Sequence, residues 1–140
     1  MVSRLVREQY EFETRRKIAS SEPGWRPEMW SQFAELGLLA APFSEEDGGF
    51  GGPVDVMVMM EEFGKGLVLE PYLATVILFG GLIQPGSNQT LQANLIPSTI
   101  DGPCQGPHAS VPRPSRFVMN DVTTTRAPHA PDRLTPAHPA

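Results

Sequence analysis

Residues 30–52, WSQFAELGLLAAPFSEEDGGFGG, carry the clearest signals of secondary structure in the chain. Apolar side chains recur at spacings of three and four around Trp30 and Phe33, which predicts one buried face of an α-helix. Gly37 fits the left-handed position at which many helices end. The following segment, 42–52, is rich in glycine and acidic residues and predicts a loop between helices.

Further helical signals lie on both sides of this stretch. Pro27 and Pro53 suit the first turn of a helix, where the missing N–H of proline costs little. A segment that is apolar almost all round, residues 71–83, is expected to be the buried centre of the domain. The predicted fold class is all-α: a small bundle of about five helices, at residues 3–19, 27–36, 53–65, 71–83 and in a last segment that Ser87 caps and Pro97 ends.

The buried side of the third predicted helix can be read from its spacing. In residues 53–65, the side chains expected to face the core are Val56, Met57, Met60 and Phe63. The neighbouring carboxylates Glu61 and Glu62 point about 100° apart on a helix, so they do not share a site.

Composition changes sharply after Gly102. Eight of the 15 prolines lie in residues 103–140, where large apolar side chains are few. Proline removes backbone donors and blocks helix formation. Residues 103–140 are therefore predicted to be an irregular Pro-rich tail, separate from a domain of residues 1–102. At most one short strand is expected there, near residues 116–125.

Charge and composition exclude several classes of function. The formal net charge of -5 argues against nucleic acid as a partner and against docking on an anionic membrane by charge alone. The longest apolar run, residues 72–83, is shorter than the roughly 20 residues that span a bilayer. The single cysteine, Cys104, gives no disulfide framework. A cytoplasmic or organelle-matrix location is expected.

Candidate chemical sites are weak. The glycines of residues 48–52 do not fit a phosphate-binding fingerprint, because no strand precedes them and no Lys-Ser/Thr pair follows. The acidic run at residues 45–47 is expected to be a solvated loop. Glu70 suits the positive end of a helix dipole. No catalytic, cofactor-binding or metal-ligating residue is therefore expected.

The order of these signals resembles the N-terminal domain of acyl-CoA dehydrogenases. No single motif is specific, but five in order at fitting spacing carry weight. The resemblance covers roughly residues 4–102. It rests on Trp30-Ser-Gln-Phe-Ala-Glu-Leu-Gly37, Pro42-Phe-Ser-Glu-Glu-Asp-Gly-Gly-Phe-Gly51, Glu61-Glu62-Phe63-Gly64, Gly86-Ser87 and Leu95-Ile96-Pro97 with Gly102 after it.

The resemblance implies a role in an FAD-dependent oxidation of an acyl-CoA thioester between its α and β carbons. In the family, the flavin lies in a middle β-domain and the catalytic base in most members in a C-terminal helical domain. This chain is therefore expected to bind no FAD alone. The N-terminal domain contributes one wall of the acyl pocket, which the alignment places at Leu73, Val76 and Ile77. The competing interpretation, which apolar helix positions favour in general, is that these residues are ordinary core of a buried helix.

Beyond Gly102 the chain departs from the family pattern, which suggests a truncated gene or a disturbed reading frame. A full-length member would act on an acyl-CoA substrate, and here a homo-oligomer or domains supplied in trans are possible partners. A second hypothesis is a small helical interaction module with no catalytic activity, which docks through its apolar helix. A third is the product of a decayed gene with no role.

Overall fold

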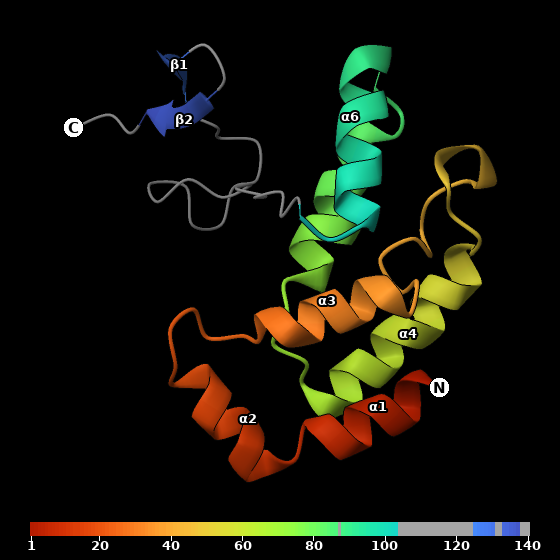
Figure 1. The fold of residues 1–140 in the computed structure, drawn as a ribbon, viewed down its shortest axis with the longest axis vertical. Coiled ribbons are helices and arrows are strands. Elements are labelled where there is room, and N and C mark those ends of the chain that lie inside the picture. Colours follow the sequence, from red (N-terminus) through yellow and green to blue (C-terminus); the bar gives the residue numbers. More distant parts are fainter. Residues whose placement is uncertain (87, 104–124, 131–132, 138–140) are drawn as a thin grey trace, which may run out of the picture. The chain divides into compact units, whose positions relative to one another are not determined.

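The computed structural model describes residues 1–86, 88–103, 125–130 and 133–137, and it divides into two units, residues 1–107 and 108–140. All regular elements in the described part of the first unit are helices (Figure 1), which confirms the predicted all-α bundle. Its elements are α1 (Val2–Gln9), α2 (Phe12–Ala19), α3 (Pro27–Glu35), the 3₁₀ turn η1 (Glu45–Asp47), α4 (Pro53–Gly66), the π-helix η2 (Leu73–Phe79), α5 (Gly80–Ile83) and α6 (Gln89–Ile100).

The second unit contains an antiparallel pair of strands, β1 (Thr125–Ala130) and β2 (Arg133–Ala137). The strand predicted near residues 116–125 lies outside the described residues except for Thr125. A pair gives each strand a partner, which a lone strand would lack. Both strands are edge strands, and this position tolerates Pro128 and Pro136.

The core of the helical unit is a run of aromatic rings between α3, α4 and the start of η2. The ring of Phe33, which is fully buried, stacks on Phe63 with centroids 5.2 Å apart. Phe63 in turn meets the edge of Tyr72 at 5.1 Å. The Tyr72 hydroxyl donates to the Leu38 carbonyl at 2.9 Å, so its one polar atom is satisfied inside the core.

The end of α3 follows the prediction. Gly37 has φ +72°, in the left-handed region that favours glycine, and its N–H donates to the Ala34 carbonyl. Leu38 then donates to the Phe33 carbonyl, closing the helix end. The Trp30 indole N–H donates to the Gly102 carbonyl at 2.9 Å, so the first and last motifs of the helical unit are joined directly.

The first predicted helix, residues 3–19, is wrong as a single element. The chain breaks at Tyr10 and Glu11 into α1 and α2. No glycine or proline marks this break. The Tyr10 side chain is buried and its hydroxyl donates to the Glu70 carboxylate, so a contact with a residue 60 positions away sets where α1 ends.

Two further expectations about apolar faces are wrong. Met57 of α4 is 62% exposed, and Met59 is buried in its place beside Phe63. The segment 71–83 is not buried all round, because Leu73, Leu78 and Leu82 are exposed while its opposite side is buried. Both helices are apolar on more than one side, so spacing alone does not identify the face that meets the core.

The last helix differs at both ends from the prediction. Ser87 lies outside the described residues, and Asn88 is the N-cap, accepting from the Leu91 N–H at 3.1 Å. Pro97 does not end α6, which continues to Ile100. Thr99 in the last turn is fully buried, so this turn packs against the rest of the unit, and its hydroxyl donates to the Leu95 carbonyl within the helix. In the described residues, no helix is both long and apolar enough to cross a membrane.

Candidate functional site: an apolar cleft beside η2 and α5

A largely apolar cleft of about 480 Å³ lies between the loop after α3, the start of α4 and the η2–α5 segment. Its volume falls within the range of about 300–1,000 Å³ that small-molecule sites occupy. One side is the loop at Pro42–Ser44 and Gly51–Pro53, and the other carries Val76 and Ile77, followed by Gly80, Gly81 and Gln84. Val56 of α4 completes the lining.

The loop side of the cleft is held by close backbone packing. A Cβ added to Gly49 would overlap the Phe43 carbonyl, and one added to Gly51 would overlap the Ala41 carbonyl. The Ser44 hydroxyl donates to Asp47 at 2.7 Å across η1. The glycine-rich loop therefore owes these two glycines to contact with its own chain.

The same packing tests whether this part of the chain fits the flavin that the resemblance implies. A phosphate-binding loop leaves its glycine backbone free to approach the ligand. Here the backbone at Gly49 and Gly51 is already against protein carbonyls. The described residues do not fit a flavin site at this loop.

The structure separates the three residues proposed from sequence to line a pocket. Val76 and Ile77 line the cleft, with Val76 almost fully buried at its base. Leu73 is 51% exposed and lies in a different hollow of about 260 Å³, with Phe63 and Leu67. Leu73 and Ile77 therefore do not line the common pocket that the family resemblance implied.

A buried polar cluster fixes the chain just before η2. Glu70 is 5% exposed, accepts from the Tyr10 hydroxyl, and accepts from the Arg26 backbone N–H at 3.4 Å. Burial first, and then the hydrogen bond to Glu70, raise the pKa of the Tyr10 phenol above its ordinary value. Sequence reasoning assigned Glu70 to the helix dipole and missed this cluster, because no local pattern links residues so far apart.

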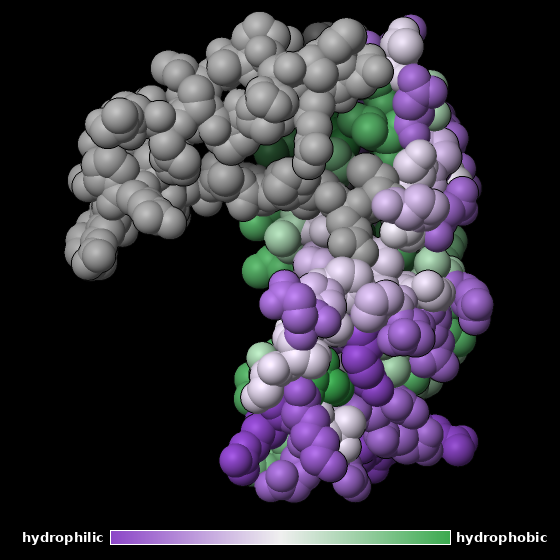
Figure 2. All heavy atoms as spheres, turned by 60° about the vertical axis from the view of Figure 1, so that its left-hand side comes forward, coloured by the Kyte–Doolittle hydropathy of each residue, from purple (hydrophilic) through white to green (hydrophobic). Residues whose placement is uncertain are grey.

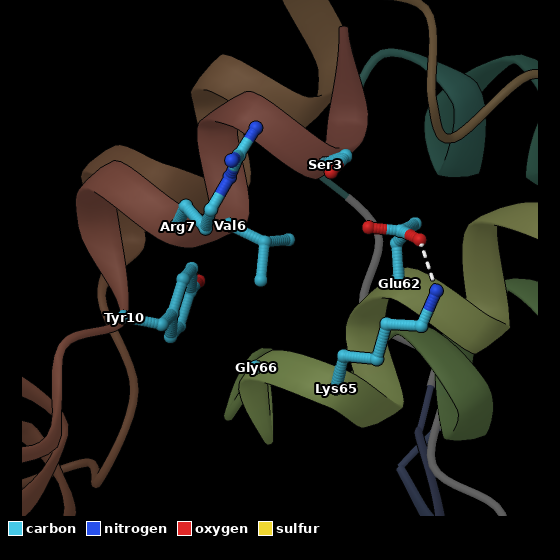
Figure 3. Close-up of a pocket in the computed structure, with 7 residues that line it drawn as sticks. All are labelled: Ser3, Val6, Arg7, Tyr10, Glu62, Lys65 and Gly66. Carbon is cyan, nitrogen blue, oxygen red and sulfur yellow. Dashed lines mark hydrogen bonds and ion pairs between the residues drawn. The ribbon is translucent and has the colours of Figure 1, made fainter.

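A second hollow of about 410 Å³ lies between α1 and α4 (Figure 3). Lys65 donates to Glu62 at 2.6 Å at its edge, and this hydrogen bond raises the pKa of Lys65 and lowers that of Glu62. The Val6 side chain packs directly on the α4 backbone here, since a Cβ on Gly66 would overlap it. Figure 2 shows that hydrophilic residues dominate the lower part of the face it presents, where α1 and α2 lie in Figure 1.

Metal chemistry finds no support in the part of the chain that the structure describes. No group of three or more His, Cys, Asp or Glu side chains there could hold an ion. The acidic run at residues 45–47 forms η1, in which the Asp47 carboxylate accepts from the Ser44 hydroxyl, rather than a set of converging ligands. The apolar cleft is therefore the best candidate site among the described residues.

Residues 1–103 match the family pattern described as "Acyl-CoA dehydrogenase, N-terminal domain". Together with the helical fold, this match shows that the chain belongs to the acyl-CoA dehydrogenase family. It is 36% identical over 93 residues to acyl-CoA dehydrogenase IpdE2 of Mycolicibacterium smegmatis, an alignment that covers 65% of this chain and 30% of that protein.

Two solved structures share the fold. The ChsE4-ChsE5 complex from Mycobacterium tuberculosis matches with a TM-score of 0.65 and 25% identity, over 72% of this chain and 28% of that one. A variant of the Tcur3481-Tcur3483 steroid ACAD matches with a TM-score of 0.65 and 24% identity, over the same shares. The chain thus spans less than a third of the length of these relatives.

Proposed function

We propose that residues 1–103 act as the N-terminal domain of an FAD-dependent acyl-CoA dehydrogenase, and that the cleft beside η2 and α5 forms one wall of its acyl pocket. The observation that carries the proposal is the cleft itself, whose base and side are Val76 and Ile77. An aliphatic group is held by apolar contact area, and these side chains supply it.

The proposed division of labour follows from what the described residues can do. Val76 and Ile77 can bind and orient an acyl chain and exclude water from it. Glu70, the one carboxylate buried near η2, accepts from Tyr10 and Arg26 and does not line the cleft, so it does not act as the base. We place the flavin and the base in polypeptide beyond the matched residues, and this chain alone is inactive in our account.

The missing parts could come from the same gene product or from another polypeptide. The relative whose structure is titled as a ChsE4-ChsE5 complex supports assembly with a partner subunit. On this chain, Val54, Met57 and Val58 form an exposed apolar face on α4, which further domains or a second copy would cover.

The same exposed face favours one alternative, a helical interaction module with no catalytic role. Val54, Met57 and Val58 lie at spacings of three and four on one side of α4, as anchors of a helix that docks do. The two proposed functions predict different binding properties for the cleft. A pocket wall must have affinity for acyl thioesters, whereas an interaction module needs none.

Binding of octanoyl-CoA to the purified chain, followed by NMR of labelled isoleucine methyl groups, tests the proposed function. We expect the Ile77 methyl resonances to shift in proportion to ligand, because Ile77 lines the cleft. Ile18, buried in α2 and absent from the cleft lining, is the internal control and should not move. Shifts confined to other methyl groups, or none at saturating thioester, would reject the acyl-pocket role.

A further inference from the structure

Glycines line both sides of the cleft, and most have a packing reason. A Cβ on Gly80 would lie 2.7 Å from the Phe43 ring, and one on Gly51 would overlap the Ala41 carbonyl. Gly52 is the N-cap of α4, a position that glycine occupies readily, and its N–H donates to Asp55 at 3.0 Å. At these positions the surrounding protein or the helix end accounts for glycine.

Gly81 has no such reason. It lies within α5, its φ is not in the left-handed region, and a Cβ built on it meets nothing within 4 Å. Glycine inside a helix is less stable than alanine, because it has more conformational freedom to lose. The position therefore carries an unfavourable residue that neither the backbone nor the packing requires.

The location of Gly81 suggests why a glycine, which has no side chain, occupies this position. It lies at the exposed rim of the cleft, with Ile77 and Gln84 in the same lining. Any side chain placed there would extend into open space rather than into protein. A ring is wider than a linear acyl chain, so it needs more width at the rim.

We propose that Gly81 is a specificity-determining position that keeps the cleft wide enough for an acyl-CoA thioester with a ring-bearing acyl group. The inference rests on the proposed function, since it names the substrate class of the same cleft. Gly81 would contribute to specificity by leaving space where a side chain would otherwise stand. Neither hydrophobic spacing nor a sequence motif identifies a position of this kind.

The test compares two thioesters with equal numbers of acyl carbons, cyclohexylacetyl-CoA and octanoyl-CoA, on the full chain and its Gly81→Val variant. Binding is followed at the Ile77 methyl resonances. The unmodified chain should bind the ring-bearing thioester at least as tightly as the linear one. In the variant, we expect affinity for cyclohexylacetyl-CoA to fall by about tenfold or more, and affinity for octanoyl-CoA to fall much less.

The matched control is Gly64→Val. Gly64 is also a helix glycine with nothing within 4 Å of an added Cβ, but it lines the smaller hollow of about 260 Å³ and not the cleft. It should leave both affinities unchanged. Gly81→Ala, which keeps helix propensity high, should show a smaller loss in the same direction and replaces the valine variant if that does not fold.

The outcomes separate the inference from the function on which it rests. Equal losses for the two thioesters, no loss, or the same loss in Gly64→Val would overturn the role of Gly81 and leave the acyl pocket standing. Failure of the unmodified chain to bind either thioester would overturn the acyl pocket, and the role of Gly81 with it.

Discussion

Replacing Phe33 with alanine is expected to lower the free energy of unfolding by about 3–5 kcal/mol, the usual range for losing a buried phenylalanine. Phe33 has no exposed surface, stacks on Phe63 at 5.2 Å, and lies 6.5 Å from the Trp30 ring. Its removal leaves a cavity where α3 meets α4. The free energy of unfolding of native domains is typically only about 5–15 kcal/mol, so this variant would lose a large part of its stability.

Urea unfolding followed by far-ultraviolet circular dichroism measures this loss. Phe12→Ala is the matched control, since Phe12 is 62% exposed on α2 and its truncation should change stability by no more than about 0.5 kcal/mol. Similar unfolding midpoints for the two variants would mean that the α3–α4 stack is not the core of the domain.

Alkaline pH should unfold the protein as its two tyrosines are forced to ionise. Burial raises the pKa of both phenols above the ordinary value, and at Tyr10 the hydrogen bond to Glu70 adds to the shift. A raised pKa in the folded state contributes stability below the ordinary phenol pKa of about 10 and loses it as pH rises further. Stability is therefore expected to fall steadily above about pH 10.

Ultraviolet absorbance of tyrosinate, read together with circular dichroism, checks this. Tyrosinate should appear only as helical signal disappears, because Tyr10 and Tyr72 are the only tyrosines and both are buried. In Tyr10→Phe, about half of the absorbance change should remain, and it should still coincide with unfolding. Tyrosinate forming near pH 10 while the helices stay intact would contradict the buried placement of these rings.

Local signals explain how much of the fold was predictable. Pro27, Gly37 and Pro53 act through backbone geometry within a few residues, and the structure places each as its local pattern indicates. The break at Tyr10 could not be found in this way. It depends on a hydrogen bond to Glu70, and a one-dimensional pattern holds no information about which distant residue is near.

The candidate site shows the same limit. The family resemblance placed Leu73, Val76 and Ile77 on one pocket wall, but only Val76 and Ile77 line the cleft, and Leu73 lies in a separate hollow. No local pattern in the sequence indicates which side of η2 faces the loop at residues 42–44. Met57 was misplaced for a different reason: α4 has apolar side chains on two sides, and the choice between them depends on what packs against it.

In our proposal this chain provides a substrate-side wall, while the redox cofactor is bound by other polypeptide. Titration of the purified chain with FAD tests this division of roles. Flavin fluorescence and visible absorbance should remain those of free FAD at every protein concentration. A saturable change with one flavin per chain, or a yellow protein after gel filtration, would contradict the claim.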